Sequence, residues 1–403
     1  MKISIIGQGY VGLPLGLAAA QAGFEVLGFD INKEVVQRLN QGQSHIEDIN
    51  QKELNKVIES GHYRATSSEQ EIEGSEVVII AVPTPLDSNR NPDLSHVIEA
   101  SQTIGKNIKT KVLVINESTS YPGTLRNLIA PTIKESSEFE GDHLYAITPE
   151  RVDPGNKEWK ISNTPRLFAG LNSEAAIKFK EVYGKFCSSL IEVSSPEVAE
   201  AAKLFENTFR QVNIALVNEF AQITEKLGIS AFETLNAASS KPYGFMKFTP
   251  SIGVGGHCIP VDPIYLLDAA RKNGADSKFI ELANNINHQM SLRVINMIEN
   301  KIESKISGKK VVIYGLSYKR NISDLRESPS IELINLLRSK GAKVSWVDPI
   351  VGSWNGEQSL VEAKDFQIAI LAVNHDIFTT KEIHESAMSI FDATGSLPGA
   401  FSF

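Results

Sequence analysis

The stretch that decides the fold stands at the start of the chain, where residues 2–6 (KISII) run straight into residues 7–12 (GQGYVG). The first segment is short, apolar and rich in β-branched side chains, which predicts a buried parallel strand. Residues 13–21 then predict a helix, and residues 25–29 predict a second strand that ends in Asp30. The three spaced glycines therefore occupy the first turn of a strand–helix–strand unit.

A lone G-x-G-x-x-G pattern is weak, but this one has the context that a dinucleotide requires. Glycines let a pyrophosphate approach the helix N-terminus, where free N–H groups and the helix dipole favour an anion. Asp30 is expected to bind the adenosine ribose hydroxyls, and its charge repels a 2′-phosphate, so NAD is favoured over NADP. The alternative is a glycine-rich turn that holds no nucleotide.

Length and composition describe a multidomain globular protein. The chain has 403 residues, enough for two or three domains, with 42% hydrophobic and 22% charged residues. The net charge of −8 and the lack of a basic run argue against nucleic acid as a partner. No segment reaches the ~18 unbroken apolar residues of a membrane span, and the first residues predict a strand, not a signal peptide. Two distant cysteines, Cys187 and Cys258, favour a reduced, cytoplasmic protein.

The first ~190 residues alternate strands and helices, which is typical of a doubly wound sheet. Further buried strands are expected at residues 77–82, 112–115 and 144–147. The segments that follow these strands are residues 83–85 (PTP), 117–119 (EST) and 149–151 (PER). Because ligands bind at the carboxyl ends of strands in such sheets, we expect site residues in these three segments.

A long helix is predicted over residues 196–227, because apolar residues recur there at spacings of three and four. At about 1.5 Å per residue it would be roughly 45 Å long. A helix of this length in an α/β protein often connects domains or pairs with a second subunit. Further helical pattern runs from about residue 265 to 306.

A second strand–helix–strand unit follows, with strands at residues 310–314 and 344–348, the latter ending in the acid Asp348, and a helix at 331–339. Its turn lacks spaced glycines, so a second dinucleotide is not expected there. The predicted fold class is α/β, with two Rossmann-like doubly wound domains joined by a long central helix. The expected boundaries are an NAD-binding domain at 1–194, a central region at 195–305 and a second Rossmann-like domain at 306–403.

One cysteine lies in a suggestive setting, in residues 255–262 (GGHCIPVD). Cys258 follows a glycine pair and precedes Asp262 by four residues, and a thiolate with an acid or base nearby is a candidate nucleophile. The alternative is a buried structural cysteine beside a turn. Lys203 and Asn207 leave the same face of the expected helix, and taken alone they predict a solvated surface.

Taken together and in order, these motifs resemble the nucleotide-sugar 6-dehydrogenase family, which oxidises the C6 alcohol of a UDP-sugar to a carboxylate in two NAD-dependent steps. The resemblance covers nearly the whole chain. The matching segments are residues 7–13 (GQGYVGL), 82–85 (VPTP), 117–119 (EST), 149–151 (PER), 202–207 (AKLFEN), 255–262 (GGHCIPVD), 315–319 (GLSYK) and 324–328 (DLRES).

The resemblance implies covalent catalysis. The alcohol is oxidised to an aldehyde, Cys258 adds to it, the thiohemiacetal gives up a second hydride to become a thioester, and water releases the acid. The implied catalytic residues are Cys258, Lys203, Asn207, Asp262, Glu150 and Thr119.

The roles of these residues also follow from the resemblance. Lys203 and Asn207 are implied to stabilise the developing oxyanion, with Lys203 taking part in the first proton transfer. Asp262 is implied to assist proton transfer at the thiol or at water, and Thr119 and Glu150 to position the water. The identity of the formal base stays open.

Two binding shells are implied in the same way. The residues implied to bind NAD are Gly7, Gly9, Tyr10, Val11, Gly12, Asp30, Pro83, Thr84, Thr119 and Arg326. Those implied to bind the UDP-sugar are Glu150, Arg151, Val152, Lys203, Asn207, Lys247, Phe248, Ser251, Gly255, His257 and Lys319. Lys319 and Arg326 could instead be surface charges, and His257 either points into the sugar pocket or packs. No residues have metal-ligand spacing, so no metal is expected.

The segment around Cys258 (residues 255–262, called the Cys loop below) also indicates which sugar is the substrate. UDP-glucose members of the family tend to carry lysine where this chain has Val261. Residues 257–263 (HCIPVDP) and 149–155 (PERVDPG) instead resemble the branch that acts on UDP-N-acetylhexosamines. Residues 241–246 (KPYGFM) favour UDP-N-acetylglucosamine over UDP-N-acetylmannosamine within it.

Some features depart from the family pattern or leave alternatives open. Arg320 stands where relatives often have proline, and an arginine that some relatives supply from a partner subunit has no clear match, with Lys241 or Lys247 as substitutes. A homodimer through the central helix is expected. The alternatives are a UDP-glucose 6-dehydrogenase, a catalytically silent nucleotide-sugar binding protein and a one-step hydroxyacid dehydrogenase. The first two retain a UDP-sugar partner.

Overall fold

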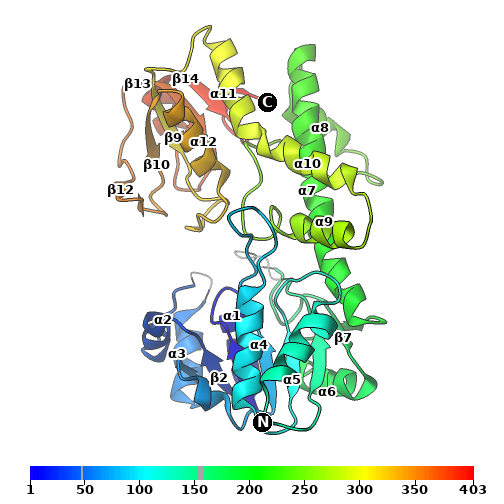
Figure 1. The fold of residues 1–403 in the computed structure, drawn as a ribbon. Helices are drawn as coiled ribbons and strands as arrows, with labels where there is room; N and C mark the ends of the chain where they lie inside the picture. Colours follow the sequence, from blue (N-terminus) through cyan, green and yellow to red (C-terminus); the bar gives the residue numbers. More distant parts are fainter. Residues whose placement is uncertain (47–48, 152–155, 157) are drawn as a thin grey trace. The chain divides into compact units, whose positions relative to one another are not determined.

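The structure is a computed structural model that describes residues 1–46, 49–151, 156 and 158–403. The chain divides into two compact units, and Figure 1 labels their helices and strands. The first unit contains Met1–Glu206 and Ile264–Asn273, and the second contains Asn207–Pro263 and Gly274–Phe403. The predicted α/β class with Rossmann-like folds and a long helix is confirmed.

The first unit is built on an eight-stranded sheet with the order β3-β2-β1-β4-β5-β6-β7-β8. Its strands are β1 (Lys2–Ile6), β2 (Glu25–Phe29), β3 (Tyr63–Thr66), β4 (Val77–Ile80), β5 (Leu113–Asn116), β6 (Leu144–Ile147), β7 (Arg166–Gly170) and β8 (Leu190–Glu192). Strands β1 to β6 run parallel, and β7 is antiparallel to β6. The strand order reverses between β1 and β4, which is where such sheets bind ligands.

Helices flank this sheet on the sequence pattern predicted for them. They are α1 (Gly12–Gln21), α2 (Lys33–Asn40), α3 (Gln51–Glu59), α4 (Ser95–Asn107), α5 (Ala130–Ser136) and α6 (Ser173–Tyr183), with short turns at Glu69–Ile72 and Leu125–Ile129. Apolar side chains of α1, α3 and α6 share one buried core with β1. The carboxyl ends of β4, β5 and β6 are neighbours. The three segments that follow these strands, called the tails below, therefore meet at one edge as expected; they are residues 83–85, 117–119 and 149–151.

The second unit contains a five-stranded parallel sheet with the order β10-β9-β13-β14-β15. Its strands are β9 (Lys310–Tyr314), β10 (Lys343–Val347), β13 (Phe366–Leu371), β14 (Ala387–Asp392) and β15 (Phe401–Ser402), and β11 (Ser353–Trp354) and β12 (Glu357–Gln358) form a separate hairpin. Helices α12 (Pro329–Ser339) and α13 (Thr380–Ser386) belong to the same fold. The neighbours β10, β9 and β13 repeat the order β2-β1-β4 of the first unit.

The long helix α7 spans Pro196–Leu227, as the apolar spacing predicts, and the boundary between the units falls within it. The remaining helices are α8 (Ala231–Ala238), α9 (Asp262–Lys272), α10 (Lys278–His288) and α11 (Met290–Lys301). The helical pattern predicted over 265–306 is therefore divided among three helices. Gly274 ends the first of them in the left-handed region, with φ +72°.

Candidate active site

The turn between β1 and α1 uses its three glycines in different ways. Gly7 has φ +94°, and a Cβ there would run into the carbonyl oxygen of Ala81. A Cβ at Gly12 would run into the carbonyl oxygen of Gly7. At Gly9 an added Cβ meets no described atom within 4 Å. Gly7 and Gly12 are thus required by the turn itself, whereas Gly9 leaves room for a ligand at the N-terminus of α1.

Asp30 is fixed beside this turn by backbone donors. Gln8 N–H donates to its Oδ2 at 2.9 Å and Asn32 N–H to its Oδ1 at 2.9 Å. The buried Gln8 side chain folds back and accepts from the Tyr63 hydroxyl at 2.7 Å. These contacts orient the partly exposed carboxylate at the end of β2.

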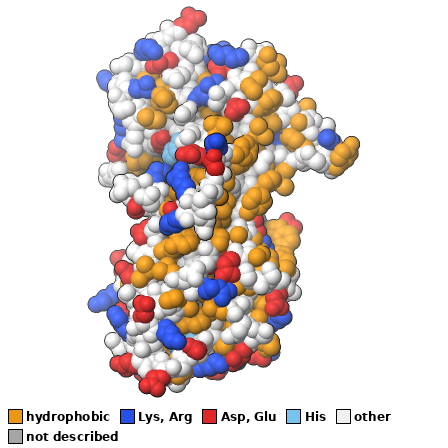
Figure 2. Space-filling view, turned by 45° about the vertical axis from the view of Figure 1, so that its right-hand side comes forward, with side chains coloured by type: hydrophobic (Ala, Val, Ile, Leu, Met, Phe, Trp, Pro, Cys, Tyr) orange, Lys and Arg blue, Asp and Glu red, His pale blue; other side chains and the backbone are white. Residues whose placement is uncertain are grey.

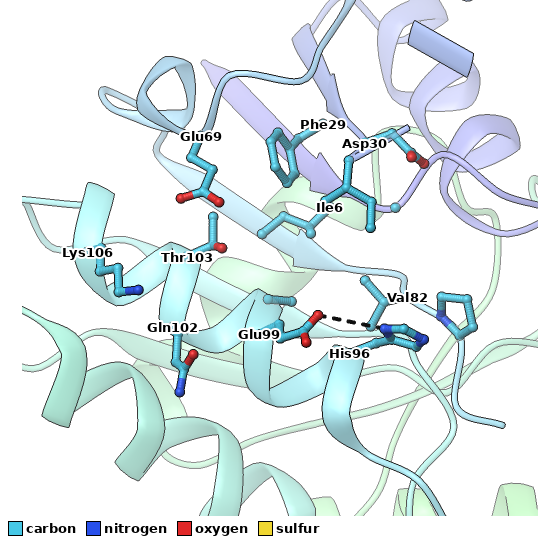
Figure 3. A pocket seen from close by; sticks show the side chains of 14 residues that line it. Ile6, Phe29, Asp30, Glu69, Val82, His96, Glu99, Gln102, Thr103 and Lys106 are labelled. Atoms are coloured by element: carbon cyan, nitrogen blue, oxygen red, sulfur yellow. Dashed lines mark ion pairs between the residues drawn. The ribbon is translucent and has the colours of Figure 1, made fainter. Parts of the chain in front are cut away.

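A cavity of about 490 Å³ opens beside Gly7 and Asp30. Figure 3 shows Ile6, Phe29 and Val82 on its apolar side and a row of α4 side chains facing it. Those α4 residues are His96, Glu99, Gln102, Thr103 and Lys106. An apolar cavity next to an oriented acid and an open helix N-terminus fits the adenosine and pyrophosphate of a dinucleotide.

Hydrogen bonds join the three tails to one another at the carboxyl edge of the sheet. The Ser118 hydroxyl donates to the carbonyl of Val82 at 2.8 Å and accepts from its N–H at 2.9 Å. Glu150 N–H donates to the carbonyl of Glu117 at 3.3 Å. Predicted NAD residues Thr84 and Thr119 lie partly exposed in these tails, and Pro83 is exposed. The edge thus gathers the predicted side chains of the first unit.

Glu150 is part of a buried charged network that the sequence did not reveal. Arg166, at the start of β7, donates through Nη1 to both Glu117 oxygens at 2.9 Å and through Nη2 to Glu150 at 3.2 Å. The Tyr183 hydroxyl also donates to Glu117. Burial, together with repulsion from Glu150, raises the pKa of Glu117 to about 8, against the opposing charge of Arg166. The sequence shows Glu117 only as part of the segment 117–119, because nothing local identifies Arg166 as its partner.

The other predicted residues of the first unit have defined surroundings. Arg151 donates to the carbonyl of Pro165 at 2.9 Å and pairs with Glu206. Lys203 is only 8% exposed, so the solvated-face interpretation of this position is wrong. Val152 and residues 153–155 lie outside the described residues.

In the second unit, the Cys loop forms a tight turn into α9. The carbonyl oxygen of Cys258 accepts from Val261 N–H at 3.1 Å and from Asp262 N–H at 2.8 Å. The Asp262 side chain is 2% exposed and accepts from the Asn207 amide at 2.5 Å. Three predicted catalytic residues are therefore joined, and Asn207 is buried at 5% exposure instead of facing solvent.

The segment before Cys258 is fastened on two sides within the second unit. Ser251 N–H donates to the Asn218 side chain on α7 at 2.9 Å, and Phe248 packs edge-on against Phe209. Gly256 N–H donates to the carbonyl of Arg326 at 3.1 Å. A Cβ at Gly255 would lie 2.7 Å from Tyr318 Cβ and 2.8 Å from Pro329 Cδ. Glycine is therefore required at 255 because the backbones of two segments approach closely.

The remaining predicted residues of the second unit lie near these segments. Lys319 is half-buried, and its carbonyl accepts from the Ser317 hydroxyl at 2.8 Å. Arg326 is exposed and pairs with Asp324. Lys247 is exposed and contacts Asn236, and His257 is half-buried.

The turn after β9 repeats the one after β1 but uses its acid differently. Gly315 has φ +86°, and Leu316 N–H donates to Asp348 Oδ2 at 2.7 Å, as Gln8 does to Asp30. Asp348 is 0% exposed and also accepts from Ser317 N–H at 3.1 Å and from His375 Nε2 at 3.1 Å. This acid is engaged inside the protein, whereas Asp30 stays partly exposed.

The described part of the chain lacks two other kinds of feature. No group of three or more His, Cys, Asp or Glu side chains in that part of the chain could hold a metal ion. None of its helices is long and apolar enough to cross a membrane.

Comparison with known protein families accounts for most of the chain. Residues 1–187 match the NAD binding domain of the UDP-glucose/GDP-mannose dehydrogenase family, residues 197–289 its central domain and residues 312–397 its UDP binding domain. The chain belongs to this family. It is thus an NAD-dependent oxidoreductase of the nucleotide-sugar dehydrogenases, as the motifs predicted.

Named relatives cover nearly the full length. The chain is 35% identical to UDP-N-acetyl-D-mannosamine dehydrogenase of Pyrococcus horikoshii over 94% of this chain and 90% of the relative. It is 35% identical to UDP-N-acetyl-D-glucosamine 6-dehydrogenase of Pseudomonas aeruginosa over 88% and 84%. The solved structure of the UDP-D-ManNAc dehydrogenase from Pyrococcus horikoshii superposes with a TM-score of 0.90 at 32% identity, over 100% of this chain and 98% of that one.

Proposed function

We propose that this protein oxidises the C6 hydroxyl of a UDP-N-acetylhexosamine to the uronic acid, with UDP-N-acetylglucosamine preferred over UDP-N-acetylmannosamine. The observation that carries the proposal is the turn at Cys258, which leads into the buried Asp262–Asn207 pair. Val261 and the names of the relatives support an N-acetylated sugar. The relatives divide between two sugars, and residues 241–246 are our reason to prefer the first.

The thiol divides the oxidation into two halves. Bound NAD supplies the acceptor for each hydride. Cys258 adds to the aldehyde carbon, and the resulting thiohemiacetal becomes a thioester in the second oxidation. Water then adds to the thioester carbon, and the C–S bond breaks with its electron pair leaving on sulfur. A cytoplasmic, reducing location is part of the proposal, because Cys258 must remain a thiol.

Other side chains handle charge and protons. Lys203 and Asn207 stabilise the oxyanion, and their burial strengthens that interaction. Asp262 exchanges protons with the thiol or with water. Glu150 takes the proton of the attacking water, which Thr119 helps to position.

The parts of the chain divide these tasks. We propose that residues 1–194 bind NAD, residues 306–403 bind the UDP moiety with Lys319, and residues 195–305 supply the Cys loop and a homodimer surface. Exposed apolar side chains on α7 support that surface, and Figure 2 shows hydrophobic side chains gathered on the side of α7 and α10. Those on α7 include Phe209, Leu216, Ile223 and Leu227, which are 40%, 62%, 49% and 65% exposed.

A substrate panel with product counting tests the proposal. We expect two NADH per sugar and a uronic acid from UDP-N-acetylglucosamine, with lower kcat/KM for UDP-N-acetylmannosamine, UDP-N-acetylgalactosamine and UDP-glucose. Cys258→Ala should form no acid. A flat NADH trace across the panel would instead identify a silent binding protein, and full turnover by Cys258→Ala would exclude the covalent route.

A further inference from the structure

The buried network around Glu150 contains a second carboxyl group, that of Glu117, which a single general base does not require. Glu117 follows β5, Glu150 follows β6 and Arg166 begins β7, with exposures of 0%, 7% and 2%. One guanidinium lies between the two carboxyl groups, donating to Glu117 twice at 2.9 Å and to Glu150 once at 3.2 Å. The side chain of Glu150 also lies close enough to Glu117 to raise its pKa.

Ionising both acids of this network at once is costly. In the described contacts two carboxyl groups meet one guanidinium in a site that water scarcely reaches, so ionising both puts excess negative charge there. A single proton shared by the carboxyl groups removes the excess. Tyr183 and Cys187 also interact with Glu117, and burial keeps both neutral by raising their pKa values, that of Cys187 to about 11.

The two acids differ in access. Glu117 is fully enclosed and receives the Tyr183 hydroxyl from the end of α6, whereas Glu150 retains some exposure at the carboxyl edge of the sheet. The segment that carries Glu150 is joined to the one that carries Glu117 by the hydrogen bond from Glu150 N–H to the Glu117 carbonyl. Glu150 is thus the outer member of the pair and Glu117 the inner one.

We propose that Glu117 and Glu150 act as one proton-accepting pair, in which Glu150 takes the proton of the attacking water and Glu117 stores it, while Arg166 holds both. The inference rests on the proposed function, because it concerns hydrolysis of the Cys258 thioester. The water O–H bond breaks, a C–O bond forms and the C–S bond breaks, with no change of oxidation state. The stored proton returns to solvent through Glu150.

Glu117 is therefore a positioning residue that acts through Glu150. A second carboxyl group makes the outer acid a stronger base than it would be beside Arg166 alone. The reactive form is the pair without its shared proton. The hydrolysis rate should then rise with pH, with its midpoint near pH 8, where burial and Glu150 place the pKa of Glu117.

The test is the pH dependence of thioester hydrolysis in two variants of the full-length enzyme. In Glu117→Gln, Glu150 titrates beside Arg166 without a second carboxylate. We expect the midpoint to move to lower pH and the limiting rate to fall roughly 10- to 100-fold, with a burst of two NADH per site preserved. Tyr183→Phe removes a donor to ionised Glu117, so its midpoint should move to higher pH. Opposite shifts are not expected from a loss of packing.

Controls separate the possible failures. Glu174→Gln, on the exposed side of α6, should leave the profile unchanged. A wild-type enzyme that makes no acid from any UDP-sugar overturns the proposed function. An active wild type whose midpoint moves in neither variant overturns only the proton pair. If a variant does not fold, infrared titration of the wild type decides, because the pair requires a protonated carboxyl group that disappears at the midpoint of the rate profile.

Discussion

At the scale of the residue, Asp30 is the side chain that we expect to set cofactor choice. Its two oxygens accept backbone N–H groups from Gln8 and Asn32, so the carboxylate is held at the rim of the cavity of about 490 Å³. The sequence predicted this acid from its position after the second strand. The spacing alone did not show that the backbone already orients it.

Removal of this charge should alter cofactor selectivity. In Asp30→Asn we expect the KM for NAD to rise about tenfold and the preference for NAD over NADP to fall by a similar factor, because a charged acceptor is worth roughly 1.5–3 kcal/mol. Initial rates with both cofactors measure this. Glu34→Gln, an exposed acid in the first turn of α2, is the control. An equal effect there would indicate general electrostatics in place of a ribose contact.

Lys203 and Asn207 mark the limit of inference at this scale. Their spacing correctly places them on one face of a helix, and an isolated pair of that kind predicts solvent exposure. The structure buries both, at 8% and 5%. Burial depends on what packs against the helix, which four-residue spacing does not encode.

Among the elements, α7 shows most clearly how tertiary contacts change the properties of a side chain. Near its start, Glu200 accepts from Gly123 N–H at 2.6 Å and from Leu125 N–H at 3.0 Å. Burial outweighs these bonds and raises the pKa of Glu200 to about 7. The folded state thus retains a proton that the unfolded chain loses near its ordinary value of 4.5. The contribution of this group to stability therefore declines as pH rises from about 4.5 to about 7.

That decline should be absent from Glu200→Gln. We expect the thermal midpoint of Glu200→Gln to fall less than that of the wild type between about pH 5 and pH 8. Each kcal/mol of pH-dependent unfolding free energy that the substitution removes should reduce the fall by about 2–4 °C. Calorimetry at both pH values measures it. Glu174→Gln, an exposed acid on α6, is the control, because the charge of Glu197 itself raises the pKa of Glu200. A wild-type pH dependence in Glu200→Gln would contradict the assignment.

The exposed stripe of α7 predicts the assembly. Leu216 and Ile223 are seven residues apart, so they lie on one face of the helix. If the proposed homodimer forms through this face, Leu216→Glu with Ile223→Glu should convert it to a monomer, which light scattering detects. Arg210→Glu also places a charge on α7, but roughly 120° around the helix, and should remain dimeric. A wild-type monomer, or a dimer that survives the double substitution, would exclude this surface.

At the scale of the whole molecule, the chain uses one fold twice for different ends. Both turns have a left-handed glycine and an N–H bonded to the acid after the next strand. In the first unit that acid stays partly exposed. In the second, Asp348 is enclosed, and His375 donates to it from Nε2 because its Nδ1 accepts from Asn321 N–H.

The equivalent substitution in the second unit should therefore raise the KM for the UDP-sugar and leave the KM for NAD nearly unchanged. Asp348→Asn loses an acceptor in a buried network, so we expect a stability loss on the order of 2 kcal/mol and a higher KM for the UDP-sugar through the 316–321 loop. The KM for NAD should stay within about twofold of the wild-type value. Thermal melts and paired KM measurements check this against Asp30→Asn. A larger rise in the KM for NAD than for the UDP-sugar would contradict the division of roles.

The sequence by itself determined the two strand–helix–strand units, the extent of α7 and the dinucleotide turn. Those signals are local, since strand and helix periods, left-handed glycines and motif spacing are read within a few residues. Only the tertiary structure decided which polar groups are buried and with whom. Asn207 meets Asp262 across 55 positions and Arg166 meets Glu117 across 49. Such pairs form because buried polar groups must find partners wherever the fold brings them, and no local pattern records that choice.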